Sequence, residues 1–102
     1  MDPRRRRVVW SPGAQADLDA TVEFIAERSH QGALQVLDAA LETAASLATL
    51  SERGRVIPER GEPNYREVFV FRYRLMYRVT HDEVQIVAFI HGARDFKSLG
   101  RG

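Results

Sequence analysis

The residues of this chain that could do chemistry are mainly arginines towards its C-terminal end. Arg74 and Arg78 stand four positions apart, which would place both side chains on one face of a strand. Arg66 precedes them, and Arg94 and Lys97 follow them. Aromatic residues are interleaved with these bases, namely Tyr65, Tyr73, Tyr77 and Phe96. Such a mixture can bind nucleic acid through phosphate contacts and base stacking, and the alternative is a solvated sheet face that happens to be rich in arginine.

The stretch QIVAFIHGARDF, Gln85–Phe96, runs from five apolar residues directly into a polar cluster. His91 is the one candidate for a general acid or base in this cluster. Gly92 would allow a bend or bulge where the strand leaves the sheet. Arg94 could form a structural ion pair with Asp95 or face outward for a partner, and the sequence leaves both roles open.

Other kinds of chemical site lack the residues that they need. The histidines His30, His81 and His91 have no second ligand at the helical spacing that metal-binding helices use, so we expect no metal site. There is no cysteine and no G-x-S-x-G motif, which argues against a nucleophilic enzyme. No glycine-rich loop joins a strand to a helix, so we expect no nucleotide cofactor.

The length and composition indicate one globular domain. The chain has 102 residues, of which 44% are hydrophobic, and we expect a single domain over 1–102 with flexible ends at 1–6 and 98–102. No apolar run approaches the roughly 20 residues of a membrane helix, and the basic N-terminus lacks the features of a signal peptide. The absence of cysteine fits a reducing cytoplasm, where we expect the protein to reside.

The charges are unevenly distributed. The net charge is only +1, yet between Pro12 and Leu50 six acidic residues face the single base Arg28, a local net charge of −5. From Tyr65 to Gly102 seven bases face four acids, a local net charge of +3. The C-terminal half is therefore the basic side of the molecule.

The elements that must position these residues follow from periodicity. Val8–Trp10 is predicted to be a strand, and a helix is predicted from Pro12, capped by Ser11, to near Ser29. A second helix is predicted over 29–50, so that the two form an antiparallel hairpin. Apolar stripes are expected on both helices: Leu18, Val22, Ile25 and Ala26 on the first, and Leu34, Leu37, Leu41, Ala44 and Ala48 on the second.

After a predicted loop over 51–64 the period changes to two, which predicts three strands near 66–71, 73–80 and 84–91. The fold class is thus α+β: a β-α-α-β-β-β two-layer domain with the N-terminal helical hairpin packed on a twisted antiparallel sheet. Arg74 and Arg78 are expected on the sheet face away from the helices. Strict alternation in the last strand would set Val84, Ile86, Ala88 and Ile90 against Gln85, Val87, Phe89 and His91.

Three stretches of the chain resemble a known family. WSPGAQADLDATVEFIAE, YRLMYRV and VQIVAFIHGARDF are similar to the signature regions of the ParE toxins, within the RelE/ParE superfamily of bacterial toxin–antitoxin systems. GRVIPE and YREV also agree with the family pattern, and the resemblance spans Val8 to Phe96. It implies a RelE/ParE-like fold with a helical hairpin over a twisted antiparallel sheet.

The resemblance also implies a function. ParE-like members inhibit DNA gyrase, RelE-like members cleave mRNA in the ribosome, and a cognate antitoxin wraps and silences both. We therefore expect a type II, plasmid-stabilising toxin that forms a hetero-oligomer with a ParD-like antitoxin whose tail is acidic and apolar. Target or antitoxin contacts are expected at a set of basic residues: Arg66, Arg74, Arg78, Arg94 and Lys97.

The two branches of the superfamily need different residues. A metal-independent endoribonuclease requires acid–base and phosphate-binding groups, and Arg74, His91 and Arg94 could supply them. The end of the chain after Arg94, DFKSLGRG, contains no tyrosine or histidine, and the stretch REVFVF carries Glu67 where RelE-like nucleases tend to have lysines. These features favour a gyrase inhibitor that acts by binding and is not an enzyme. The alternatives are the ribosome-dependent nuclease and an inactive remnant that only binds antitoxin.

Overall fold

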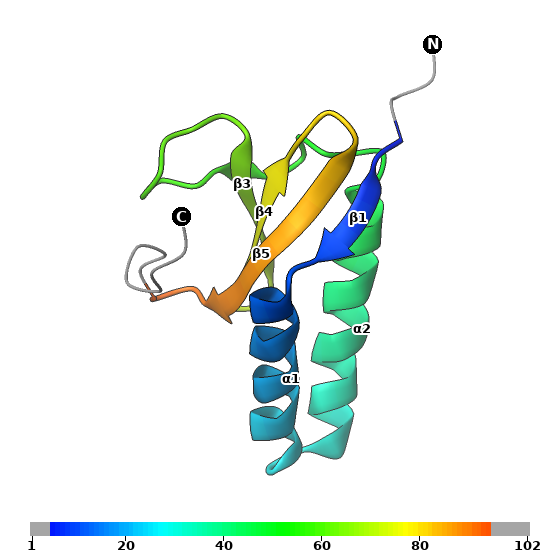
Figure 1. The fold of residues 1–102 in the computed structure, drawn as a ribbon. Helices are drawn as coiled ribbons and strands as arrows, with labels where there is room; N and C mark the ends of the chain where they lie inside the picture. Colours follow the sequence, from blue (N-terminus) through cyan, green and yellow to red (C-terminus); the bar gives the residue numbers. More distant parts are fainter. Residues whose placement is uncertain (1–4, 95–102) are drawn as a thin grey trace.

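The computed structural model describes residues 5–94, so Lys97, the segment 98–102 and most of the segment 1–6 lie outside the described part of the chain. Two helices and five strands follow one another along these residues (Figure 1). They are β1 (Arg7–Trp10), α1 (Pro12–Ala26), α2 (His30–Ser46), β2 (Arg55–Val56), β3 (Tyr65–Val70), β4 (Tyr73–Val79) and β5 (Glu83–His91).

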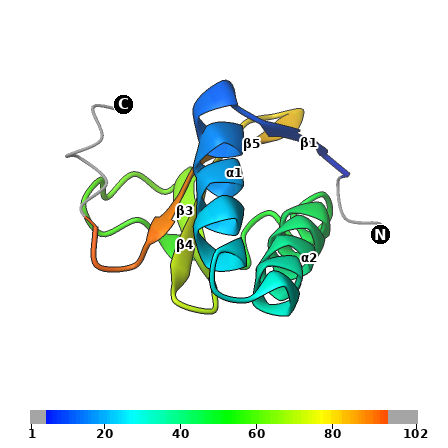
Figure 2. The same ribbon diagram turned by 90° about the horizontal axis from the view of Figure 1, so that it is seen from below.

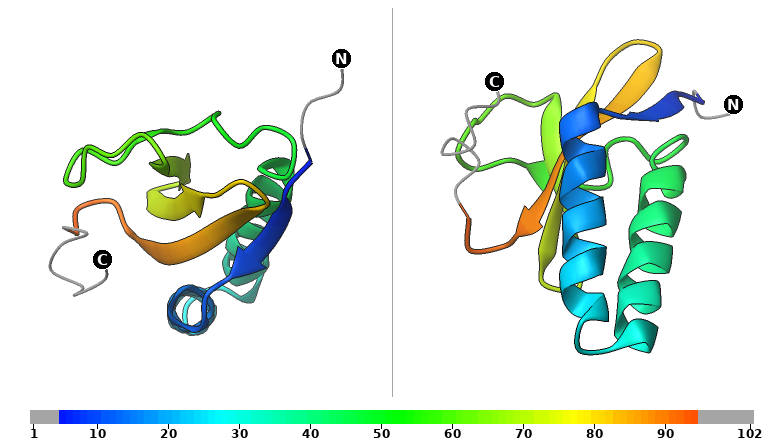
Figure 3. Two further views of the ribbon diagram at one scale, coloured as in Figure 1. Left: turned by 45° about the horizontal axis from the view of Figure 1, so that its top comes forward. Right: turned by 60° about the horizontal axis from the view of Figure 1, so that its bottom comes forward.

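The helices form an antiparallel hairpin that covers one face of a sheet with the strand order β1-β5-β4-β3-β2 (Figures 1 and 2). The α+β class and the two-layer arrangement are therefore confirmed. The sheet is mixed, however, because β1 runs parallel to β5, with Arg7 opposite Glu83 and Trp10 opposite Ile86 (Figure 3). The prediction of an antiparallel sheet was wrong at this edge, since periodicity detects a strand but not its neighbour.

The short strand β2 lies within the segment that was predicted to be a loop. It pairs with the start of β3, with Arg55 opposite Glu67 and Val56 opposite Arg66. Two residues are too few to produce a recognisable alternation, so the sequence showed only the surrounding glycines and prolines. This pairing brings the segment after β2 next to the outer face of the sheet.

Serine residues start both helices as N-caps. The Ser11 hydroxyl accepts a hydrogen bond from the Ala14 N–H at 3.1 Å, and the Ser29 hydroxyl accepts one from the Gly32 N–H at 2.9 Å. Each cap satisfies a backbone donor that the first helical turn leaves open, which stabilises a helix by about 1 kcal/mol. The predicted cap at Ser11 is confirmed. The break between the helices lies at residues 27–29, slightly earlier than predicted, because α1 ends at Ala26 and Ser29 already caps α2.

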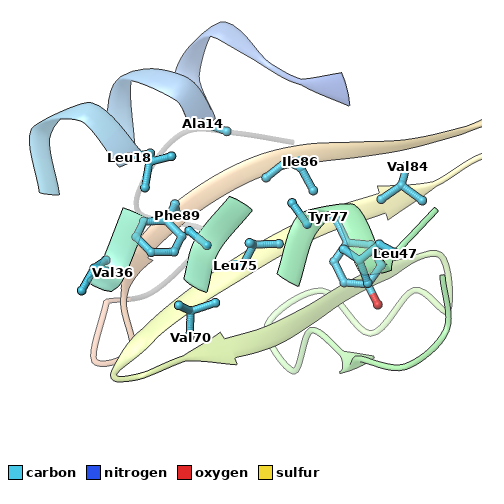
Figure 4. Close-up of a cluster of buried hydrophobic side chains, with 12 residues drawn as sticks. Ala14, Leu18, Val36, Leu47, Val70, Leu75, Tyr77, Val84, Ile86 and Phe89 are labelled. Carbon is cyan, nitrogen blue, oxygen red and sulfur yellow. The ribbon is translucent and has the colours of Figure 1, made fainter. Parts of the chain in front are cut away.

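The core between the helices and the sheet is built mainly by β4, β5 and the inner faces of the helices (Figure 4). On α2 the buried residues are Ala33, Val36, Ala40 and Ala44. The predicted stripe on this helix was partly wrong, because Leu34 and Leu41 are about half exposed. The small alanines allow close packing against α1 and the sheet, and the leucines flank that contact instead.

A β-bulge changes the faces of β5. The register with β4 passes from Tyr77 opposite Ile86 to Met76 opposite Ala88, which leaves Val87 as an extra residue. The strict alternation predicted for this strand was therefore wrong beyond Ile86. Phe89 joins the core on the helix side, while Ala88 packs on the outer face.

The outer face of the sheet is also partly covered. Ile57 packs there against Met76, Ala88 and Ile90, and all four are buried. The Ile57 N–H donates to the Tyr65 carbonyl at 2.9 Å, which ties the segment after β2 to β3. The outer face around Arg74 is therefore not the open, solvated surface that the sequence suggested.

Candidate functional site

Arg74 is buried within a cluster of ionic groups on the outer face of the sheet. Its Nε donates to Glu67 Oε1 at 2.7 Å, and its two terminal nitrogens donate to the oxygens of Glu59 at 2.6 and 2.8 Å. Its Nη1 also donates to the Arg94 carbonyl at 2.7 Å. Arg74 lies on the sheet face away from the helices, as predicted, where the two carboxylates and the Ile57 segment enclose it. Its contact with a target or antitoxin stays a prediction.

Glu67 links this cluster to the sheet edge. Its side chain is fully buried, and its second oxygen accepts a hydrogen bond from Arg55 Nε at 2.7 Å. Hydrogen bonds to Glu59, and then those to Glu67, raise the pKa of Arg74 above its ordinary value, against the opposing effect of burial. Arg74 thus remains charged and its charge is compensated within the protein.

Arg66 and Arg78 are half-buried and also make internal contacts. Arg66 Nη1 donates to the Gly54 carbonyl at 2.9 Å, and Arg78 Nη1 donates to Gln85 Oε1 at 3.2 Å. The guanidinium carbon of Arg78 lies 5.9 Å from the centre of the Tyr65 ring. These arginines hold neighbouring strands and loops together, with only part of each side chain left for a partner.

The aromatic residues predicted to accompany the arginines are distributed over different environments. Tyr77 is in the core, where its hydroxyl oxygen accepts from the Gly54 N–H at 3.0 Å and burial raises its pKa. Tyr73 stacks on Phe89 with 5.3 Å between ring centres. The guanidinium carbons of Arg60 and Arg78 lie 3.7 and 5.9 Å from the centre of the Tyr65 ring, and Phe96 lies outside the described residues. Within residues 5–94 these aromatic residues are therefore divided between the core and the surface.

His91 and Arg94 are exposed and line one hollow at the end of β5. The hollow has a volume of about 320 Å³ and lies between α1 and the sheet. Its lining residues are Asp17, Ala20, Thr21, Phe24, Tyr73, Ile90, His91 and Arg94. The His91 ring stands edge-on to Tyr73 at 6.0 Å, and its Nδ1 accepts from the Ala93 N–H at 3.2 Å. The proposed pairing of Arg94 with Asp95 lies outside the described residues.

Gly92 is needed for close packing. A Cβ atom on this residue would lie 3.0 Å from the Arg72 carbonyl and 3.2 Å from the Phe69 ring. The bulge of this strand is at Val87, and the Gly92 N–H continues the pairing by donating to the Arg72 carbonyl at 2.8 Å. Gly92 therefore lets the strand end approach the β3–β4 turn.

Sequence reasoning missed three phenylalanines around this strand end. Phe24, Phe69 and Phe71 expose 58%, 51% and 64% of their surfaces. Phe71 also has a φ of 53°, in the left-handed region that bulky residues rarely adopt. The available signals were the position of Phe24 outside the apolar stripe of its helix and a β3–β4 turn without Gly, Asn or Asp.

Within residues 5–94 no group of three or more His, Cys, Asp or Glu side chains is arranged to hold a metal ion. Over the same residues, neither helix has the length and apolar composition needed to cross a membrane.

The sequence over residues 8–96 matches the family model described as ParE toxin of type II toxin-antitoxin system, parDE. This chain belongs to the ParE toxin family. The resemblance seen in the sequence is thus confirmed, and the protein is the toxin component of a type II toxin–antitoxin system.

Two solved structures have a similar fold. This ParE-family chain is similar to one from the chromosomal ParDE toxin–antitoxin system of P. aeruginosa, with a TM-score of 0.70 and 22% identity over 86% of this chain and 97% of the other. It is also similar to a chain of the E. coli DinJ–YafQ complex, with a TM-score of 0.56 and 15% identity over 90% of this chain and 99% of the other. No curated protein matches it in sequence.

Proposed function

We propose that this ParE-family toxin inhibits DNA gyrase by binding it, in the bacterial cytoplasm, and that a cognate antitoxin neutralises it. The observation that carries the proposal is the internal use of Arg74. In the endoribonuclease interpretation of the sequence, Arg74 was a candidate to stabilise a phosphate, but its guanidinium is occupied by Glu59, Glu67 and the Arg94 carbonyl. A binding mechanism needs no such free cation.

The antitoxin that we propose has a ParD-like tail with acidic residues set among apolar anchors, disordered alone and ordered when bound. The half-exposed Leu34 and Leu41 stand seven positions apart on α2 and so share one side of the helix. They offer an elongated apolar stripe for the anchors. Because Arg74 is enclosed, the acids of the tail would instead meet partly exposed bases such as Arg66, Arg78 and Arg94.

The alternative is a ribosome-dependent mRNA endonuclease. One observation favours it: His91, Arg94 and Tyr73 line the same hollow, so an acid–base group and an exposed cation lie at one place. In that case Arg94 rather than Arg74 would contact the phosphate. An inactive remnant that only binds antitoxin is the third possibility.

Purified toxin added to a gyrase supercoiling assay separates these functions. We expect loss of supercoiling and accumulation of cleavage complexes at micromolar toxin, with both effects reversed by the antitoxin. A parallel reaction contains translating ribosomes and labelled mRNA. If gyrase is not inhibited, and mRNA is cleaved by the wild type but not by His91→Ala, the protein is the endonuclease and the gyrase proposal is wrong. No effect on growth after induction in a host without the antitoxin gene would indicate the inactive remnant.

A further inference from the structure

At one end of the molecule β5 ends and β3 turns into β4 beside α1 (Figure 2). Four aromatic side chains and two arginines gather there. We call this surface the aromatic end. It consists of Phe24, Phe69, Phe71, Tyr73, Arg72 and Arg94. Two hollows meet at it, since Tyr73 lines both the hollow that contains Phe24 and Arg94 and a second one that contains Phe71 and Arg72. Phe69 reaches this end from the outer face of the sheet, where it lies near Gly92 and opposite Arg74.

The backbone at Phe71 is strained in a way that exposes its ring. The φ of 53° is unfavourable for a residue with a bulky side chain, and glycine would adopt it freely. The unfavourable backbone conformation is not offset by burial of the ring. Among the large hydrophobic residues described in residues 5–94, Phe71 has the largest exposed fraction. Val70 pairs with Tyr73, so Phe71 and Arg72 form a two-residue hairpin turn, whose first residue takes a positive φ. Phenylalanine is an unfavourable choice at this position, and its exposed ring suits a binding surface.

The composition of the aromatic end suits a protein partner with negative charge. Arg28 lies over the Phe24 ring and Arg55 over the Phe69 ring, each 5.5 Å from the ring centre. Arg72 and Arg94 are exposed as well. Of the nearby carboxylates, Asp17 lines the first hollow and accepts a hydrogen bond from the Phe89 N–H at 3.0 Å, and those of Glu59 and Glu67 are engaged with Arg74. Aromatic residues and arginine dominate the binding energy of protein interfaces, and carboxylates around the partner's apolar socket would complement the arginines.

The aromatic end and the leucine stripe on α2 use different side chains, although Gly32, Gln35 and Val36 of α2 line the second hollow. Leu34 and Leu41 line neither of the hollows at Tyr73. A toxin must recognise two partners, its target and its antitoxin, and the chain presents two distinct apolar surfaces. The stripe is elongated and suits a flexible tail, while the aromatic end is a compact group of projecting rings.

We propose that the aromatic end is the surface that engages the toxin's protein target, by inserting Phe24 and Phe71 into an apolar socket rimmed by carboxylates on a folded protein. The antitoxin tail then binds mainly through the α2 stripe. This inference rests on the proposed function only in naming gyrase as the target.

The test uses a variant that removes the ring and also relieves the backbone strain. Phe71→Gly is compatible with the positive φ, so the folded toxin should be at least as resistant to denaturant as the wild type. We expect Phe71→Gly combined with Phe24→Ser to raise the toxin concentration for half-inhibition of gyrase by about tenfold or more, as loss of central interface residues does. Affinity for the antitoxin encoded beside the toxin should change less than about threefold. The matched control is Leu50→Ser, because Leu50 is 55% exposed but lies outside both surfaces.

Growth arrest after induction without antitoxin is a second readout that does not depend on the identity of the target. We expect the double variant to lose it and Leu50→Ser to keep it. The inference is overturned if the double variant still arrests growth, or if it loses antitoxin affinity as strongly as it loses inhibition. If the wild type arrests growth without inhibiting gyrase, the proposed target is wrong, and loss of arrest in the double variant still supports the aromatic end. If the wild type neither arrests growth nor inhibits gyrase, both proposals are overturned.

Discussion

The Nε atom of Arg74 lies 2.7 Å from Oε1 of Glu67, whose side chain is fully buried beneath the outer face of the sheet. Two strands that are neighbours in the sheet thus share a charge pair that water does not reach. Glu59 joins the pair from the segment that follows β2. The arrangement ties a loop, β3, β4 and the end of β5 into one unit.

Breaking this pair should destabilise the protein. Arg74→Met leaves the buried Glu67 carboxylate with Arg55 as its remaining basic partner, and we expect the free energy of unfolding to fall by about 3 kcal/mol. Urea denaturation measures it. Arg74→Met together with Glu67→Leu should lose less than the single variant, because the fully buried carboxylate is removed with its partner and Glu59 is partly exposed to water. Arg72→Met, at the exposed neighbouring arginine, serves as the control, and an equal loss there would refute the assignment.

Gly54 should not tolerate a side chain. A Cβ atom at this position would lie 2.5 Å from the Glu67 carbonyl oxygen and 2.7 Å from the Tyr77 hydroxyl. We expect Gly54→Ala to lower the thermal midpoint and to cost about 2 kcal/mol, the range for overpacking a core site. Gly32→Ala is the control, since its closest neighbour is the Ser29 hydroxyl at 3.1 Å and alanine favours the helix. Comparable losses in both variants would contradict the steric argument.

The link between β1 and β5 should depend on pH. The hydrogen bond from Arg7, the largest influence, lowers the pKa of Glu83 below its ordinary value. A carboxylate with a depressed folded-state pKa stabilises the protein above its unfolded pKa of about 4.3, and this contribution disappears as the pH falls through the folded pKa. We expect Arg7→Gln to flatten the loss of stability between about pH 5 and pH 3, measured by denaturant midpoints. An unchanged slope would show that the pair contributes nothing.

His91 should be dispensable for toxicity. Its ring is exposed at the end of β5, and a toxin that acts by binding requires no proton transfer. We expect the His91→Gln variant still to arrest growth. Its concentration for half-inhibition of gyrase should stay within about threefold of the wild-type value, which is less than the tenfold change that about 1.4 kcal/mol produces. Titration of the supercoiling assay gives the comparison. A variant that folds and binds antitoxin but no longer arrests growth would point to the nuclease instead.

The local features of this protein could be predicted from its sequence. Ser11 followed by Pro12 marks the start of α1, and the change from helical period to period two marks the passage from hairpin to sheet. These signals act within a few residues of one another, through backbone hydrogen bonds and alternating side chains. The motifs over Val8–Phe96 also indicated the family, because they agree with the family pattern and occur in the same order.

The roles of individual side chains depended on residues far away in the chain. Whether Arg74 faces water was decided by Glu59, which arrives on a segment that no strand period reveals. Phe89 reached the core because the extra residue Val87 reversed the alternation of β5. Burial and charge pairing depend on which elements pack together, so the sequence determined the elements of this toxin, and only the tertiary structure decided which of its arginines and phenylalanines remain available for a partner.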